Sequence, residues 1–115
     1  MSALTGPTVC QPRHVQTAAE RQAVYAYVTE RDKTCRAPII QGMTDYNGVE
    51  AFFMALDCSG RLERHHAGNT IGSKRITSRR TVVLVCAFHH RTWAPTHSRM
   101  ILEWLARIED AKEKA

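Results

Sequence analysis

The chain has 115 residues, a formal net charge of +5 and a hydrophobic fraction of 43%. This length suits one small domain, and the composition excludes an intrinsically disordered chain. No apolar run reaches membrane-spanning length and the N-terminus has no signal-peptide pattern, so we expect a cytoplasmic protein with no membrane partner. In that compartment the four cysteines are expected to be thiols or metal ligands rather than disulfides, and Cys10 to be a free thiol.

The first predicted element is a helix that follows a flexible arm. Residues 1–16 contain two prolines and no hydrophobic periodicity, so we expect an arm there and a single domain over residues 17–115. Thr17 and Glu20 have the spacing of a capping box, which predicts a helix that runs to about Asp32. Its apolar stripe is typical of core packing and consists of Val24, Tyr27 and Val28.

The middle of the chain is predicted to be extended. Residues 33–60 are interrupted by one proline, three glycines and an asparagine and contain the short apolar run AFFMAL, which favours a strand or hairpin arm. Residues 62–66 are predicted to form a short strand, and residues 67–80 a polar loop with glycines. The β-branched run TVVLV at residues 81–85 predicts a buried strand.

Two helices are predicted in the C-terminal part. One begins near Cys86 and ends before Pro95, because proline cannot continue a helix. The other begins at about Ser98. Its apolar residues recur at helical spacing and are Met100, Ile101, Trp104, Leu105 and Ile108.

The stretch VCAFHHR contains a pair of residues spaced as zinc ligands. Cys86 and His89 lie three positions apart, so on a helix both side chains can reach one ion. His90 is rotated by about 100° from His89, so we expect it to serve a different site. Structural zinc needs four ligands, and Cys35 and Cys58 are the available partners. The alternative is that these two cysteines are separate buried thiols.

A second pair of adjacent histidines ends the predicted strand LERHH. Neighbouring residues of a strand face opposite sides, so His65 and His66 are expected to have different roles. One would bind a metal and the other would transfer a proton, since histidine titrates near neutral pH. Two partly exposed surface histidines are the alternative, but the downstream histidine pair and the cysteines around both pairs favour a functional interpretation.

The segment between the two histidine pairs is basic. From Arg61 to Arg80 it has six lysines and arginines against the single acid Glu63. Such a segment suits a polyanion such as nucleic acid. A solvated loop that needs charge for solubility is equally compatible with the charge alone.

These features follow one another in the order of a known family. A strand that ends in His-His, a basic loop, a strand and a helix with Cys-x-x-His-His resemble the HNH endonucleases, also called the His-Me finger or ββα-metal family. The chain is similar in particular to small HNH proteins of actinobacterial phages. The matching segments are TERDKTC, RLERHH, IGSKR, VVLVCAFHH and WAPTH. The resemblance implies an α+β fold in which a small zinc-stapled ββα-metal core is flanked by an N-terminal and a C-terminal helix.

The resemblance also implies roles for individual residues. His66 takes the position of the general base, while His65 and His90 take those of ligands to a catalytic divalent cation, which would be Mg²⁺, Mn²⁺, Ni²⁺ or Zn²⁺. Thr81 falls near the position of the family's middle asparagine and is a candidate substitute for it. The structural zinc positions are taken by Cys35, Cys58, Cys86 and His89.

The activity that the resemblance implies is metal-dependent hydrolysis of DNA phosphodiester bonds, as an endonuclease or a nickase, in the host cytoplasm if a phage encodes the chain. The residues expected to hold DNA phosphates without reading sequence are Arg64, Lys74, Arg75, Arg79, Arg80 and Arg91. Thr81 in place of the asparagine, and Ala94 in place of a further histidine, keep an alternative open. In it, the chain is a catalytically decayed, zinc-stapled HNH-like module that binds nucleic acid or a host protein.

Overall fold

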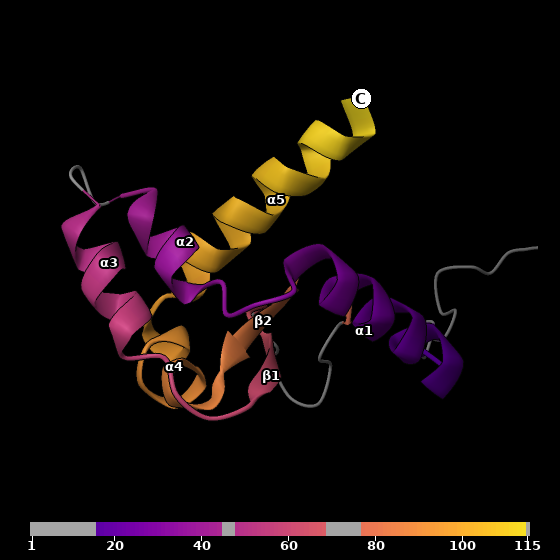
Figure 1. Ribbon diagram of the computed structural model, residues 1–115. Coiled ribbons are helices and arrows are strands. Elements are labelled where there is room, and N and C mark those ends of the chain that lie inside the picture. The colour runs from indigo at the N-terminus through magenta and orange to yellow at the C-terminus, as the bar shows by residue number, and fades with distance from the viewer. Residues whose placement is uncertain (1–15, 45–47, 69–76, 115) are drawn as a thin grey trace, which may run out of the picture.

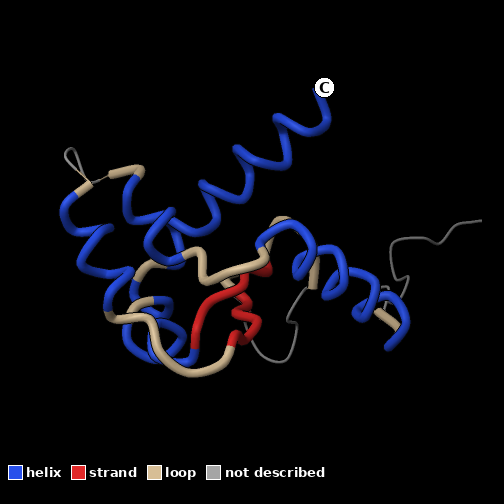
Figure 2. The backbone as a smooth tube through the Cα atoms, in the orientation of Figure 1, coloured by secondary structure: helices blue, strands red, loops and turns tan. Residues whose placement is uncertain are grey.

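The computed structural model describes residues 16–44, 48–68 and 77–114 (Figure 1). Within them the fold is of the α+β class, as predicted, with one two-stranded sheet surrounded by helices (Figure 2). The elements in chain order are α1 (Ala18–Asp32), α2 (Ala37–Gly42), α3 (Val49–Leu56), β1 (Leu62–His66), β2 (Val82–Cys86), α4 (Ala87–Thr92), the 3₁₀ turn η1 (Ala94–Thr96) and α5 (Ser98–Lys114).

The sheet is the centre of the fold, and α1 lies on the other side of it from α2 and α3 in Figure 1. β1 and β2 are antiparallel, and their register pairs Leu62 with Cys86 and His66 with Val82. All five residues of β2 are buried. Alternate residues of β2 therefore contribute to two apolar clusters. One includes Val28 of α1, Val82 and Leu84, and the other contains Ala37, Ile40, Val83, Val85, Trp93, Ile101, Trp104 and Leu105.

Helix α1 begins as the capping box predicts. The backbone N–H of Glu20 donates to the Thr17 hydroxyl at 3.1 Å, and the N–H of Thr17 donates to the Glu20 carboxylate at 2.8 Å. The side-chain amide of Gln16 forms two hydrogen bonds with the backbone of Thr77, so this residue is anchored. The rest of the predicted arm, with Cys10, lies outside the described residues, and the division into an arm and one domain stays a prediction.

The prediction of a strand or hairpin arm over residues 33–60 is wrong, because α2 and α3 are helices. Pro38 lies in the first turn of α2, where proline costs no hydrogen bond. Gly48, with φ of 72°, precedes α3. Pro38 and Gly48 thus mark the starts of helices rather than turns between strands. A short apolar run such as AFFMAL has no periodicity that separates a helix from a strand.

The other predicted helices and strands are confirmed within a residue or two, whereas most of the predicted loop over residues 67–80 lies outside the described residues. β1 spans the predicted residues, β2 is shifted by one position, α4 ends before Pro95, and α5 begins at Ser98. In the part of the chain that the structure describes, no helix combines the length and the apolar character needed to cross a membrane.

A buried charged network joins α1 to α5 and β2. The Arg31 side chain is 3% exposed and forms ion pairs with Asp32 at 2.6 Å and Glu109 at 3.2 Å. The Tyr27 hydroxyl donates to Glu109, and the backbone N–H of Leu84 donates to Asp32. Burial opposes the Arg31 charge, but the two carboxylates outweigh it and raise the pKa of Arg31. Each buried charge in this network therefore has an opposite charge beside it.

Candidate metal centre and histidine site

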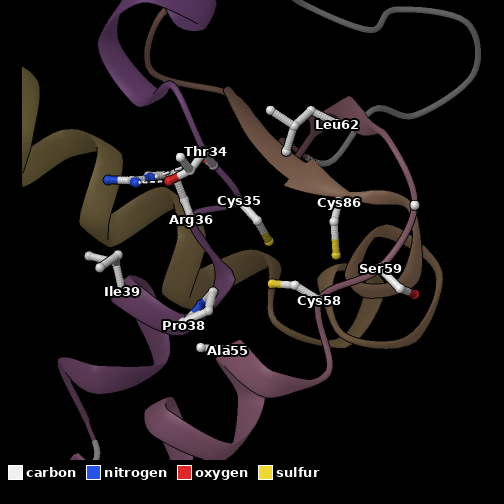
Figure 3. A pocket seen from close by; sticks show the side chains of 11 residues that line it. Thr34, Cys35, Arg36, Pro38, Ile39, Ala55, Cys58, Ser59, Leu62 and Cys86 are labelled. Atoms are coloured by element: carbon white, nitrogen blue, oxygen red, sulfur yellow. Dashed lines mark hydrogen bonds between the residues drawn. The ribbon is translucent and has the colours of Figure 1, made fainter.

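Four side chains that are far apart in the sequence converge between β2, α4 and the end of α3. Their ligand atoms, on Cys35, Cys58, Cys86 and His89, all lie within 4.8 Å of one another. Figure 3 shows the three cysteine sulfurs pointing toward one another. Cys35 lies in the connection between α1 and α2, Cys58 follows α3, Cys86 ends β2, and His89 lies in α4. The predicted grouping of these four residues is thus confirmed.

The spacing within this quartet fits a tetrahedral metal. The His89 Nδ1 atom is 3.5 Å from the Cys35 and Cys58 sulfurs and 3.2 Å from the Cys86 sulfur. A tetrahedron with Zn–S of about 2.3 Å and Zn–N of about 2.0 Å has a sulfur–nitrogen edge of about 3.5 Å. The three thiols and one imidazole are also the donor set that structural zinc prefers. The quartet could therefore hold a structural metal such as zinc.

Backbone contacts hold the ligands in place. Cys86 caps the N-terminus of α4, where its sulfur accepts the N–H of His89. The N–H of Ala87 donates to the carbonyl of Arg61 at 2.9 Å, which ties the segment after Cys58 to the same turn. Gly60 in this segment has φ of 85°, and a Cβ there would lie 2.7 Å from the Ala87 Cβ. Only glycine therefore lets this segment approach α4 so closely.

Burial and neighbouring groups shift the pKa values of the three cysteine thiols. Burial raises the pKa of the Cys35 thiol. Cys58 is exposed as a residue, yet desolvation of its thiol and the proximity of Cys35 and Cys86 raise its pKa to about 12. Burial also opposes ionisation of Cys86, but N–H donors of His89 and Ser59 outweigh it and lower its pKa. Three thiolates so close together need a cation between them, and a divalent metal would supply that charge.

The imidazole of His89 is kept in the form that binds metals. Burial lowers its pKa, while the charge of Asp57 acts in the opposite direction. His89 is therefore neutral at pH 7, and a neutral imidazole has a lone pair to donate. The Nδ1 atom, which faces the three sulfurs, is the ligand atom that the geometry indicates.

The second histidine of α4 faces another site, as its helical rotation predicts. The His90 ring lies 5.2 Å from the His65 ring between centroids, at an interplanar angle of 78°. His90 Nδ1 is 2.7 Å from a carboxylate oxygen of Glu63, and the hydrogen bond lowers the pKa of Glu63. An ionised carboxylate only accepts, so Nδ1 of His90 is the donor in this bond, and Nε2 is the nitrogen that remains for another partner. Glu63 was not among the predicted site residues, although strand alternation places it on the face of His65.

His66 has different surroundings from His65. Its Nε2 atom is 3.2 Å from the Tyr25 hydroxyl of α1 and 3.3 Å from the Thr77 hydroxyl. The guanidinium of Arg64 lies over the Tyr25 ring at 4.4 Å. The structure thus brings His65 to His90, whereas the contacts of His66 lead to α1. Tyr25 and Thr77 were not predicted, because tertiary contacts bring them to His66, Tyr25 from α1 and Thr77 from the segment before β2.

Thr81, the predicted substitute for the family's asparagine, has two kinds of contact. Its hydroxyl accepts the N–H of Ser78 at 3.1 Å and lies 3.3 Å from the Ser78 carbonyl. Its carbonyl accepts the N–H of Ala67 at 2.7 Å. The main chain of Thr81 therefore holds the residue that follows His66, while a catalytic role for its side chain stays a prediction.

The predicted phosphate-binding residues differ in their exposure and in whether an acidic residue balances their charge. Those that the structure describes are Arg64, Arg79, Arg80 and Arg91; Lys74 and Arg75 lie outside the described residues. Arg64, Arg79 and Arg91 are exposed, and Arg79 lies over the Tyr27 ring at 4.1 Å. Arg80 forms ion pairs with Asp110 at 2.7 Å and Glu113 at 3.0 Å. The charge of Arg80 is thus balanced within the fold, which makes it the weakest of the described candidates.

Protein-family models, curated proteins and solved structures were compared with this chain, and none of them matches it.

Proposed function

We propose that this protein is a metal-dependent DNA endonuclease or nickase of the HNH type. The observation that carries the proposal is the pairing of His65 and His90, whose rings lie 5.2 Å apart on a strand and on the helix that follows the sheet. β1, β2 and α4 are consecutive in the described fold, and α4 contacts both strands. Two strands followed by a helix, with one histidine pair at the end of β1 and the other in α4, have the order expected of a ββα-metal core.

The donors at this pair fit a divalent transition metal. Two imidazole nitrogens suit Mn²⁺, Ni²⁺ or Zn²⁺ better than Mg²⁺, which prefers oxygen ligands. Glu63 would orient the His90 ring through Nδ1 so that Nε2 serves as ligand. Among the described residues, the zinc-type quartet is the only set of three or more His, Cys, Asp or Glu side chains that meets, so water and phosphate oxygens would complete this second site. A cation bound there would stabilise charge on the scissile phosphate.

His66 is the candidate general base. When its Nε2 atom carries the proton and donates it to the hydroxyl of Tyr25 or Thr77, the Nδ1 atom is left to accept a proton from water. That water would attack phosphorus in line with the departing oxygen. The exposed residues Arg64 and Arg79 would bind neighbouring phosphates.

One observation favours the alternative of a non-catalytic, zinc-stapled module that binds nucleic acid or a host protein. Ala94 is fully buried against the core, at the position where many members of the family have a further histidine. A cation held by two side chains would bind weakly, and loss of that cation would leave a binding protein on the same scaffold. The two functions differ in whether DNA is cut or only bound.

A plasmid-nicking assay separates them. We expect zinc-loaded protein to convert supercoiled plasmid to open circles with Mn²⁺ or Ni²⁺, and to do so more slowly with Mg²⁺. His66→Gln is the matched variant, because its amide can still bond to Tyr25 but cannot take a proton from water. Circular dichroism and zinc content must equal those of the wild type. Plasmid binding without nicking in any metal, or equal nicking by His66→Gln, would contradict the nuclease proposal.

A further inference from the structure

The α2–α3 pair exposes an apolar surface that no other part of the chain covers among the residues that the structure describes. Its members, which we name the α2–α3 surface, are Ile39, Met43, Val49, Phe52, Phe53 and Leu56. Their exposed fractions range from 36% for Met43 to 65% for Leu56, and α3 has no buried residue. Two adjacent phenylalanines that are each more than half exposed are unusual on a monomer, and contiguous apolar patches of this kind mark interaction sites.

The surface belongs to a tightly packed hairpin rather than to a loosely attached segment. α2 and α3 lie side by side, away from α1 (Figure 1). A Cβ at Gly42 of α2 would lie 3.4 Å from the Ala51 Cβ of α3, so the two backbones approach closely. Met54 packs on the main core and the Gln41 side chain bonds to Trp93, so each helix is held to the rest of the domain. The exposed side chains therefore project from a fixed support.

A hollow of about 420 Å³ borders the α2–α3 surface at Ile39. Its apolar wall comes from Ile39 and Pro38 of α2, Ala55 of α3 and Leu62 of β1, and the three cysteines of the quartet also line it (Figure 3). Leu62 is itself 44% exposed, which extends the apolar area across the hollow. The exposed side chain of Ile39 thus joins the α2–α3 surface to a hollow at its edge.

We propose that the α2–α3 surface binds the same surface of a second copy of this chain. A two-fold interface must be complementary to itself, and an exposed apolar helix face that packs against the same face of a second copy satisfies this condition. The six side chains of the surface expose roughly 600–700 Å² of solvent-accessible area. This area is close to the ~800 Å² that each partner contributes to a standard interface. The proposal does not depend on the proposed nuclease activity.

The charges around the surface favour a second copy over a polyanion or an anionic membrane. Charged residues of both signs border the surface: Arg36 lines the hollow, Glu50 and Asp57 lie at the two ends of α3, and Arg107 lies 3.8 Å from the Met43 sulfur. Glu50 stands at the start of α3 and Asp57 directly after its end, while Arg36 precedes α2. Two copies related by a two-fold axis, with their α3 helices antiparallel, can pair acids of one copy with bases of the other, whereas an anionic partner would favour a rim of bases alone.

Sedimentation equilibrium of the full-length, zinc-loaded protein tests this proposal. We expect a mass that rises from that of one chain to that of two as the concentration increases through the micromolar range, and goes no higher. Phe53→Glu should raise the dimer dissociation constant at least about tenfold, because it buries a charge at the centre of the interface. Gln22→Glu is the matched control: it adds the same charge to an exposed position of α1 and should leave the constant unchanged.

Three results would overturn the proposal. They are a single-chain mass at every concentration reached, association that continues beyond two chains, and a dimer that Phe53→Glu and Phe52→Glu leave intact. Because both rings are exposed, neither variant removes a buried contact. Unchanged zinc content and circular dichroism confirm that each variant is folded.

Discussion

Zinc affinity should fall steeply as the pH is lowered, because the metal has to displace protons from the quartet. Burial raises the pKa of Cys35, and burial with the neighbouring thiols raises that of Cys58 to about 12, so both are protonated at pH 7 without metal. Cys86, whose pKa is lowered, contributes between none and one further proton. His89, whose pKa is also lowered, is already neutral and contributes none. Zinc binding should thus release two to three protons.

The magnitude follows from this proton count. Each released proton changes the dissociation constant about tenfold per pH unit, so the constant should rise about 100- to 1000-fold when the pH falls from about 8 to about 7. The sign is the one expected for thiols whose pKa values lie above the working pH: stabilisation by zinc increases as the pH rises toward them. Competition with a chromophoric chelator across this range measures the constant, and calorimetry in buffers of different ionisation enthalpy counts the protons.

Cys10→Ser is the control for this measurement, because Cys10 is predicted to be a free thiol and its loss should change neither the affinity nor the pH slope. A slope of tenfold per pH unit or less would mean that no more than one proton is displaced. That result would refute the inference that the thiols of the metal-free quartet are protonated. A slope that disappears in Cys10→Ser would place the metal elsewhere in the chain.

Three further changes test other parts of the structure. Glu109→Ala should destabilise the fold by about 3 kcal/mol, since Glu109 is 2% exposed and its loss removes one of the two carboxylates that pair with Arg31. Glu103→Ala, on the exposed face of α5, is the control and should cost under about 0.5 kcal/mol in urea unfolding. Glu63→Gln should reduce Mn²⁺-dependent nicking about 10- to 100-fold without loss of zinc, and unchanged Mn²⁺ dependence would argue against its orientation of His90. Gly60→Ala should lower the melting temperature and weaken zinc binding, because its Cβ would collide with α4; wild-type values for both would contradict the close approach.

Much of the secondary structure could be predicted because its signals are local. The capping box of Thr17 and Glu20 marks the start of α1, and both of its hydrogen bonds form. The β-branched residues of β2 and the apolar stripe of α5 are periodic over enough residues to identify their elements. Residues 33–60 were misassigned because α2 and α3 are short and α3 is exposed, so neither a stripe nor burial distinguishes them from strands.

The candidate sites divide in the same way. The spacing of Cys86 and His89, and the rotation of His90 away from them, follow from helix geometry and could be predicted from a few residues. Cys35 and Cys58 could be assigned only by counting the ligands that zinc requires, and the connections after α1 and α3 bring them to the quartet.

The sequence by itself thus determined which side chains could bind a metal or move a proton, since those properties belong to the residue types and to their spacing along one element. Only the tertiary structure decided which of them meet. Glu63 reaches His90 because β1 lies against α4, and Tyr25 reaches His66 because α1 packs near the end of β1. The exposure of α3 also depends on the tertiary structure, because an apolar helix is buried only where another element packs against it. Contacts between distant segments depend on packing of the whole core, which no local spacing contains.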